Sequence, residues 1–395
     1  MAWLPVSPRA YWVAGSLLLL VSLVVRALSY SVQTSDYIYY VSKWCTMLKS
    51  TPGLTAFLHP FSDYAPLYLY LLKPLAFVPV STLYSTKTVS VLFEILAAAI
   101  AVRLLRHARP EVYERPERRF VAFALFLCVP TLLLNSSLWG QADALYAAGV
   151  IASLYFLILD RPLAATLAFA LGICVKVQAV FFLPILAGYL LQKSGGWRYL
   201  ALVPLVYVLL IIPAWMGGGS FGDLLFVYLR ESGEYPYLSV SAQSIFAFAN
   251  GVALTPGATS VLFWMGILAA LAAAMLVIVY IKHAPQVLAP RQWVFISLAS
   301  VLLLPYLLPR MHERYFYLAD LFAVLYALLS PREWFIAVAV VVASLLSYLP
   351  YLGNQTPLLA PVRGVDLRVP SLLLLVVVSY VAYALWQSYR ANISK

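Results

Sequence analysis

The sequence predicts an all-α protein that crosses a membrane many times. Of its 395 residues, 64% are hydrophobic and 10% are charged, and the mean hydropathy is +0.90. So few polar side chains cannot cover a water-facing surface. The apolar runs have the length of a bilayer-spanning helix, roughly 18 to 22 residues, and lack the alternation of a membrane β-strand. A polytopic helical bundle is therefore the predicted fold class.

Apolar runs separated by polar residues predict about 11 to 13 membrane-spanning helices in a single domain, residues 1–395. The first run, from Tyr11 to about Tyr30, is too long for the core of a signal peptide and is expected to remain as a helix. The expected spans are residues 11–30, 85–106, 119–134, 140–158, 162–175, 178–192, 199–216, 258–282, 292–308, 314–330, 334–350 and 370–388.

The run "PLYLYLLKPLAFVPV" at residues 66–80 decides the expected topology. It is short, contains Pro74 and carries Lys73, which suits a re-entrant or interfacial segment. If it crossed the bilayer, the basic stretch at residues 103–119 would face outward, against the preference of short Lys/Arg-rich loops for the cytoplasm. We therefore expect both chain termini to be cytoplasmic.

This topology leaves two long polar loops on the extracytoplasmic face. The first covers residues 31–84 and the second covers residues 217–257. Within the second, "EYPYLSVSAQSIFAFANG" is polar and aromatic, so it predicts a structured loop or short helix over the membrane. The glycines at residues 217–219 precede it as a flexible hinge.

The first outer loop contains two acidic and aromatic pairs. They are Asp36 and Tyr37 in "SDYIYY", and Asp63 and Tyr64 in "SDYAPLY". A carboxylate at bilayer level is costly, so it usually faces a cavity, a partner or water. From position alone, Asp36 is equally well explained as a helix cap or a solvated boundary residue, and a capping role is the stronger explanation for Asp63.

Two further motifs lie at expected outer helix ends. "SLWGQADALY" contains Trp139, Gln141 and Asp143, and an interfacial tryptophan and a first-turn acid are ordinary features there. "CVKVQAV" places Lys176 and Gln178 at the junction of two apolar runs. A lysine at this depth either extends to the lipid headgroups or meets an anion.

The densest polar cluster is "LPRMHERYFYLAD", which contains Arg310, His312, Glu313 and Arg314 between two expected spans. A guanidinium offers paired N–H groups in the geometry that phosphate oxygens accept, and a histidine adds another donor. A charged turn that anchors two helices is the alternative. Together with Lys176, these donors predict a phosphate-binding site.

A phosphate site beside a carboxylate suggests sugar transfer from a phospholipid carrier. The sugar–phosphate bond breaks through an oxocarbenium-like state, the phosphate leaves as an anion, and the acceptor hydroxyl loses a proton. A transfer that inverts the anomeric centre needs one base and no nucleophile. Asp36 alone would be sufficient for that role.

Five motifs occur in the order "SDYIYY", "DYAPLYLYLLKPL", "SLWGQADALYA", "GICVKVQAVFFLP" and "MHERYFY", between Ser35 and Tyr317. This order resembles the membrane glycosyltransferases of the GT-C class, in particular the prokaryotic mannosyltransferase family related to the second glycosylphosphatidylinositol mannosyltransferase. The resemblance implies surface helices in the first outer loop, matching residues 37–50 and 66–80. One departure is Ala65, where many relatives have a second proline.

The resemblance also implies substrates and residue roles. The donor would be a polyprenyl or dolichyl phosphate sugar, with mannose as the expected sugar, and the acceptor would be lipid-linked or a glycan on the extracytoplasmic face. By position, Asp36 matches the catalytic base, and His312 and Arg314 match the contacts to the donor phosphate. Arg310 and Lys176 are further candidates for phosphate binding. Substrate-binding or supporting roles are expected for Asp63, Tyr64, Tyr37, Trp139, Gln141, Asp143, Gln178 and Glu313.

Metal ions and nucleic acids are not expected partners. The three cysteines and four histidines lack metal-ligand spacing. Asp36 and Asp63 could share Mg²⁺ or Mn²⁺, but no strict metal requirement is expected. The net charge of +11 is carried by short loops, which favours membrane lipids and lipid phosphates over nucleic acid.

A lipid or solute transporter, such as a flippase, is the main alternative function, because transporters also need polar residues within the membrane. Such a protein would more naturally show paired inverted repeats and spans broken near the bilayer centre. This sequence instead gathers its polar motifs on one expected face. A purely structural scaffold would leave "MHERY" and the two aspartates unexplained.

Overall fold

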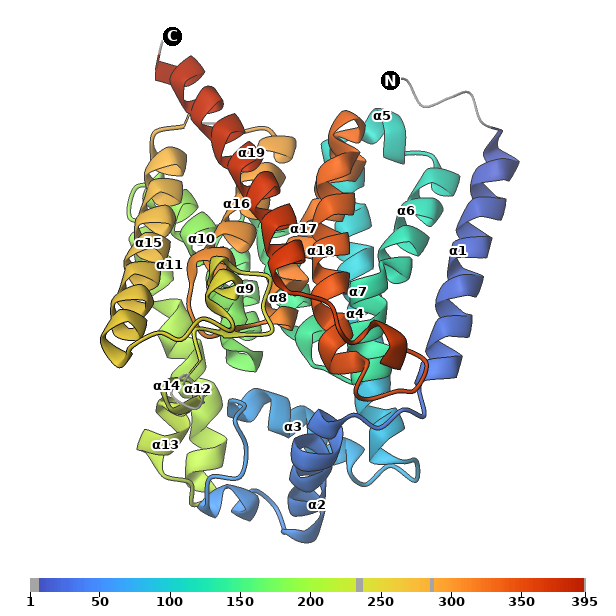
Figure 1. Ribbon diagram of the computed structural model, residues 1–395, viewed down its shortest axis with the longest axis vertical. Helices are drawn as coiled ribbons and strands as arrows, with labels where there is room; N and C mark the ends of the chain where they lie inside the picture. Colours follow the sequence, from blue (N-terminus) through green and yellow to red (C-terminus); the bar gives the residue numbers. More distant parts are fainter. Residues whose placement is uncertain (1–6, 232–236, 285–287, 394–395) are drawn as a thin grey trace.

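The computed structural model describes residues 7–231, 237–284 and 288–393, and these residues form a helical bundle (Figure 1). The longer elements are α1 (Pro8–Ser29), α4 (Thr82–Ala108), α6 (Pro116–Cys128), α8 (Asp143–Ile158), α9 (Pro162–Val175), α10 (Leu183–Leu191), α12 (Leu202–Met216), α15 (Pro256–Lys282), α16 (Pro290–Leu307), α17 (Tyr317–Leu329), α18 (Trp334–Leu352) and α19 (Arg368–Ile393). Each expected span overlaps one of these helices, which confirms an all-α membrane protein.

Short elements connect the longer helices. The α-helical ones are α2 (Ser42–Ser50), α3 (Pro66–Leu75), α5 (Pro110–Tyr113), α7 (Pro130–Leu134), α11 (Trp197–Leu200), α13 (Phe221–Leu225) and α14 (Val227–Glu231). The 3-10 and π-helical ones are η1 (Tyr37–Val41), η2 (Thr55–Leu58), η3 (Asn135–Trp139), η4 (Val177–Phe182), η5 (Ile245–Ala249), η6 (Glu313–Phe316), η7 (Pro331–Glu333) and η8 (Ala360–Val362). Two strands, β1 (Ser239–Val240) and β2 (Met311–His312), pair in parallel.

Not every helix is long enough to cross a bilayer by itself. Within the described ranges, six helices meet the requirements of length and hydropathy: α1, α4, Trp197–Met216, α15, Pro331–Leu352 and α19. A pair bent by 55°, Pro116–Cys128 and Pro130–Trp139, makes a seventh if it counts as one span. α8, α9 and the segment Val177–Leu191 are shorter apolar helices. The total of 11 to 13 crossings therefore remains a prediction.

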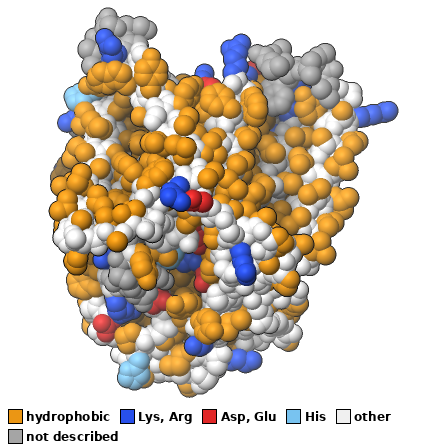
Figure 2. All heavy atoms as spheres, viewed as in Figure 1, with side chains coloured by type: hydrophobic (Ala, Val, Ile, Leu, Met, Phe, Trp, Pro, Cys, Tyr) orange, Lys and Arg blue, Asp and Glu red, His pale blue; other side chains and the backbone are white. Residues whose placement is uncertain are grey.

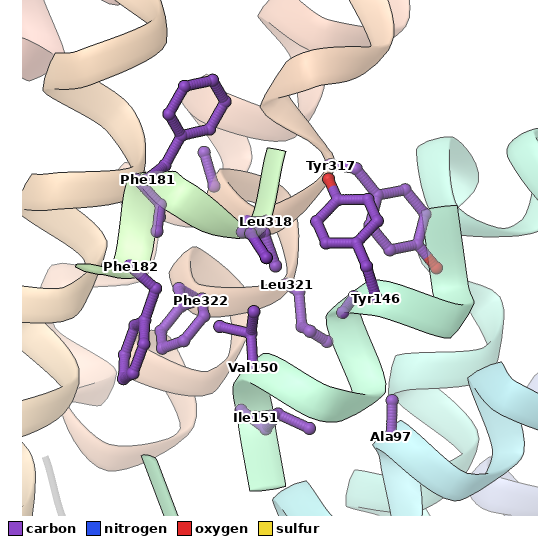
Figure 3. Packing of buried hydrophobic residues seen from close by; sticks show 14 of the residues in the cluster. Ala97, Tyr146, Val150, Ile151, Phe181, Phe182, Tyr317, Leu318, Leu321 and Phe322 are labelled. Atoms are coloured by element: carbon purple, nitrogen blue, oxygen red, sulfur yellow. The ribbon is translucent and has the colours of Figure 1, made fainter. Parts of the chain in front are cut away.

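Two of the shorter helices, α8 and α17, form the interior of the bundle. α17 has the sequence "YLADLFAVLYALL" and is buried on almost every side, as expected of a helix that is apolar all round. Figure 3 shows Leu318 and Phe322 of α17 packed against Val150 of α8 and Phe182 of η4. The rings of Phe182 and Phe322 stack with centroids 6.0 Å apart. These contacts fix α8 and α17, the two helices that begin beside the polar motifs.

The peripheral helices present apolar side chains outward. In α1 and α15, Leu28, Leu268 and Leu276 are 77%, 64% and 69% exposed. Figure 2 shows one face of the molecule with a broad apolar surface over its upper part and more polar and charged groups toward the bottom. Exposed leucines at this density are suited to lipid and not to water.

The two ends of the bundle differ. α1 begins and α19 ends at the top of Figure 1, whereas α2, α3 and α13 lie at the bottom. The two expected surface helices are present as η1 with α2 and as α3. The expected loop at 217–257 contains α13, α14, β1 and η5, and its residues 232–236 lie outside the described part of the chain. The position of this end relative to the membrane stays a prediction.

Candidate active site

Asp36 lies where the chain leaves α1 and enters η1. The buried ammonium of Lys87 in α4 closes the C-terminal end of α1 by donating to the carbonyl oxygens of Ser29 (3.1 Å), Tyr30 (3.1 Å) and Val32 (2.7 Å). A helix end leaves such carbonyls without partners, so a lysine here satisfies them. The turn that carries Asp36 is therefore anchored to α4.

The carboxylate of Asp36 accepts three side-chain hydrogen bonds on one oxygen, Oδ2. The donors are Trp139 Nε1 at 3.0 Å, Gln141 Nε2 at 2.7 Å and Arg314 Nη1 at 2.7 Å. The other oxygen, Oδ1, receives none of these three bonds. The surroundings of Asp36 thus exceed what a helix cap requires, and they bring together three of the sequence motifs.

Asp36 is held in its ionised form. Burial by itself raises the pKa of the carboxyl, but the charge of Arg314 and hydrogen bonds from Trp139, Tyr351 and Arg314 outweigh burial and hold the pKa below its usual value. A carboxylate that is ionised at neutral pH can accept a proton without first losing one.

The turn after α7 places Trp139 and Gln141 beside the carboxylate. η3 ends at Trp139, and the next residue, Gly140, has a φ of 79°, in the left-handed region that glycine tolerates. On either side of it, Thr34 Oγ1 donates to the Trp139 carbonyl at 3.0 Å and Ser90 Oγ donates to the Gln141 carbonyl at 2.7 Å. The backbone is therefore held in place at both residues whose side chains donate to Asp36.

The motif "MHERY" reaches the same place from the other end of the chain. β2 pairs with β1, with His312 opposite Val240, and η6 continues directly into α17. The guanidinium of Arg314 lies 5.6 Å from the centre of the Trp139 ring. Arg314 Nε is fully buried and has no hydrogen-bond partner among the described residues. Arg314 therefore holds Asp36 while keeping an unused donor.

Near neutral pH, His312 is uncharged and Glu313 is partly uncharged. Burial, with the charges of Arg314 and Lys176, lowers the pKa of His312 to about 3. Burial raises the pKa of Glu313 to about 7, although the charge of Arg314 opposes the shift. His312 is thus a neutral imidazole, and Glu313 changes charge within the physiological range.

One cavity of about 240 Å³ joins these groups. Asp36, Asp63, His312, Glu313 and Arg314 all line it. Aromatic rings form much of the remaining wall: Tyr40, Trp44, Tyr64, Tyr68, Trp139 and Tyr351. Asp36 and Asp63, with two of the four phosphate-binding candidates, His312 and Arg314, therefore face a shared space large enough for a ligand.

Asp143 and Lys176 form a buried ion pair that does not line this cavity. Asn135 Nδ2 donates to Asp143 Oδ2 at 2.7 Å, and the Tyr64 ring lies 5.6 Å from the ammonium of Lys176. Because Tyr64 lines the cavity, the pair supports its wall from behind. The structure thus brings Lys176 near the site, on the far side of a cavity residue.

Three other candidates point elsewhere. The hydroxyl of Tyr37 forms a hydrogen bond with Thr82 Oγ1 at 2.7 Å, toward α4. Gln178 is buried in η4 and does not line the cavity. Arg310 lines a different cavity of about 400 Å³, where its guanidinium lies 4.7 Å from the Phe263 ring centre.

Two residues of the site were not predicted. Tyr351 at the end of α18 stacks on Trp139 with ring centroids 4.3 Å apart, and its hydroxyl accepts from the Asp36 amide at 3.2 Å. Gln355 Oε1 accepts from the Ser35 amide at 2.7 Å. Both belong to "PYLGNQTP". The available signal was an aromatic and an amide side chain next to the expected end of a helix.

Glu94 of α4 and Arg26 of α1 form a buried ion pair at 2.6 Å, which was also not predicted. Arg26 Nη1 donates to Ser136 Oγ at 2.9 Å and to Ser137 Oγ at 2.8 Å, so the pair is tied to η3. Trp139 ends that same element. Ionisable residues inside apolar runs were the signal for this pair, because such residues are rare in spans and seldom lack a partner.

A comparison with protein families identifies the activity class of the chain. A model of glycosyltransferase family 87, a GT-C-type family of membrane enzymes, matches residues 61–309, more than half of the chain. The matched range contains Asp63, Trp139 and Gln141, whereas Asp36 precedes it and His312 follows it. A search of curated proteins found no match. The chain belongs to glycosyltransferase family 87 and is therefore a glycosyltransferase.

Proposed function

We propose that this glycosyltransferase moves a sugar, with mannose as the expected one, from a polyprenyl or dolichyl phosphate to a hydroxyl group of a lipid-linked or glycan acceptor. The anomeric centre is inverted, and Asp36 is the general base. The reaction takes place on the extracytoplasmic face. Family membership favours transfer over the alternative of lipid or solute transport.

The observation that carries this proposal is the shared cavity. It combines an ionised carboxylate, Asp36, with an arginine that has a spare buried donor, Arg314, and a neutral histidine, His312. A base and a phosphate-binding group within one space are the two requirements of inverting transfer from a sugar phosphate. The aromatic wall offers flat apolar surfaces for the sugar ring.

Each bond change has a group to support it. The acceptor oxygen bonds to the anomeric carbon while the bond from that carbon to the phosphate oxygen breaks, and the electron pair remains on the phosphate. The hydroxyl proton passes to Asp36, which later releases it to water. Arg314 and His312 donate to the phosphate oxygens as their charge increases. The products are an inverted glycoside and polyprenyl phosphate.

Arg314 links the phosphate to the base. A phosphate oxygen at Arg314 Nε would satisfy a buried donor that otherwise costs free energy. A guanidinium that also binds phosphate attracts Asp36 less, so the pKa of the carboxyl rises toward that of an effective base. The base becomes stronger when the donor is bound.

The test of this function is a comparison of donors. The full-length protein in nanodiscs receives either synthetic polyprenyl phosphate mannose or GDP-mannose, with an alkyl mannoside as the probe acceptor. We expect a product from the polyprenyl donor alone, with NMR showing an inverted anomeric configuration. Transfer from GDP-mannose, or retention of configuration, would contradict the proposal. Polyprenyl phosphate glucose as a third donor tests the choice of sugar separately.

Transfer is expected to continue in the presence of a chelator. The leaving phosphate is stabilised by Arg314 and His312 in this proposal, so the reaction does not depend on a divalent ion. The measurement is the initial rate with polyprenyl phosphate mannose before and after treatment with excess EDTA. A rate that is lost in EDTA and restored by Mg²⁺ or Mn²⁺ would instead show a metal requirement, with Asp36 and Asp63 as the first candidate ligands to replace.

Donor affinity is expected to depend on the charge of Glu313. With a pKa of about 7, Glu313 is mostly neutral at pH 6 and mostly ionised at pH 8. Ionisation adds a negative charge beside the phosphate, so the donor KM of the wild type should rise severalfold between these pH values. In Glu313→Gln the KM should stay level over the same range. Parallel KM profiles for the two proteins would exclude this role for Glu313.

A further inference from the structure

A second large cavity lies at the end of the bundle opposite to Asp36. It has a volume of about 570 Å³ and is enclosed by the C-terminal ends of α8, α10 and α15 and the start of α16. α8 begins beside the candidate active site and is about 24 Å long, at 1.5 Å per residue, which separates the two cavities. The function proposed above makes no use of this space.

The rim of this cavity is basic. Lys193 and Lys282 line it together with one acid, Asp160, which forms an ion pair with Lys193. Tyr189 Oη also donates to Asp160 Oδ1 at 2.8 Å. Lys282 has no hydrogen-bond or ion-pair partner within residues 7–231, 237–284 and 288–393. Two lysines against one aspartate leave one positive charge to be balanced.

The carbonyl groups at the nearby helix ends do not engage both lysines as hydrogen-bond donors. Gln192 Nε2 donates to the carbonyl oxygen of Ile281 and so satisfies part of the C-terminal end of α15. Lys193 is occupied by Asp160 and by the ring of Tyr189, whose centre is 4.9 Å from its ammonium. Lys282 therefore remains available at the rim for an anion from outside the chain.

The floor of the cavity is apolar and aromatic. Tyr189, Trp293, Leu157 and Leu288 line it and are buried, and the rings of Tyr189 and Trp293 meet edge to face at 6.0 Å. On the neighbouring surface of α15, Met275 and Leu276 are exposed to 60% and 69%. The cavity thus offers a charged rim, an apolar floor and an adjoining lipid-facing helix.

We infer that this cavity binds the headgroup of an anionic phospholipid. The phosphodiester binds Lys282 and a further N–H of Lys193, whose ammonium has three donors and keeps its ion pair with Asp160. The glycerol region rests on Trp293 and Tyr189, and the acyl chains follow the outer face of α15. The single negative charge of a phosphodiester equals the unbalanced charge of the rim. Basic pockets between membrane helices bind anionic headgroups in this manner.

The test uses the delipidated full-length protein and native mass spectrometry. Phosphatidylglycerol is the anionic probe and phosphatidylcholine the zwitterionic one. We expect phosphatidylglycerol to bind more tightly, with about fivefold weaker binding in Lys282→Gln and about 25-fold weaker binding when Lys193→Gln is added. Arg332→Gln is the matched control, because it removes one positive charge from an exposed residue at the same end of the bundle, outside the cavity.

Three outcomes would overturn the inference. Equal binding of the two lipids would remove the charge recognition. Equal losses in Lys282→Gln and Arg332→Gln would show general attraction to the basic end of the bundle. Displacement of phosphatidylglycerol by millimolar inorganic phosphate would show a site for phosphate alone and not for a lipid. Thermal unfolding of each variant confirms that a loss of binding does not arise from unfolding.

Discussion

Replacement of Asp36 by asparagine is expected to lower kcat about 10²- to 10⁴-fold, the contribution of a positioned general base. Asparagine has the shape of aspartate, and its carbonyl oxygen can keep the position of Oδ2, where Trp139, Gln141 and Arg314 donate. Its amide group then occupies the position of Oδ1 and cannot accept the proton. Asp36→Asn should therefore fold and bind the donor but fail in transfer.

The measurement is single-turnover transfer from polyprenyl phosphate mannose, combined with donor binding and thermal unfolding. Asp366→Asn is the matched control. Asp366 is an exposed aspartate that also pairs with an arginine, Arg368, but it does not line the cavity. Asp366→Asn should transfer at the wild-type rate. A comparable rate in Asp36→Asn would remove the role of base from Asp36, and loss of activity in Asp63→Asn alone would transfer that role to Asp63.

The fold class and the positions of the helices follow from local information. Hydropathy and run length predict where the chain is helical. The run at residues 66–80, predicted as non-spanning from the basic stretch at 103–119 and from Pro74 and Lys73, forms only the ten-residue helix α3. Helix length is less predictable, because α8 and α17 are short but are buried inside the bundle almost throughout. An apolar run does not reveal whether it faces lipid or protein.

The meeting of Asp36 with His312 and Arg314 could be anticipated because the expected topology places both segments on one face. The directions in which the side chains point could not be anticipated from the sequence. Arg310 and His312 are only two residues apart, but their side chains line different cavities. The chain turns at Arg310, whose φ is 61°, so the two side chains point in different directions. Tyr351 reaches Asp36 across 315 positions of sequence. Contacts at that separation leave no local pattern.

The largest effect on stability is expected at Glu94. Arg26 uses its N–H groups on Ser22, Ser136, Ser137, the Leu127 carbonyl and Glu94, all within the buried part of the bundle. Glu94→Ala removes the carboxylate and the side chain beyond Cβ, and it leaves the guanidinium buried without its counter-charge. Breaking one half of a buried pair costs about 3 to 5 kcal/mol. We expect a loss of that size in the free energy of unfolding.

Glu114→Ala provides the matched control, because Glu114 pairs with Arg106 at an exposed site. Exposed pairs contribute about 0 to 1 kcal/mol, so this variant should unfold nearly as the wild type does. Both variants are measured by denaturant unfolding in the same detergent. Equal losses in Glu94→Ala and Glu114→Ala would show that the Arg26–Glu94 pair is not buried as described.

A double variant separates the effect of the Arg26–Glu94 pair on the stability of the fold from its effect on the position of Trp139. Arg26→Met combined with Glu94→Met removes both charges and fills the space with apolar atoms, so most of the lost stability should return. Ser136 and Ser137 would still lack their arginine partner, and η3, which ends at Trp139, would be held less firmly. We therefore expect the double variant to unfold nearly like the wild type while kcat stays reduced and donor KM is little changed. Full recovery of kcat would assign the pair to stability alone, with the turn at Trp139 positioned by Thr34 on the Trp139 carbonyl and by Ser90 on the Gln141 carbonyl.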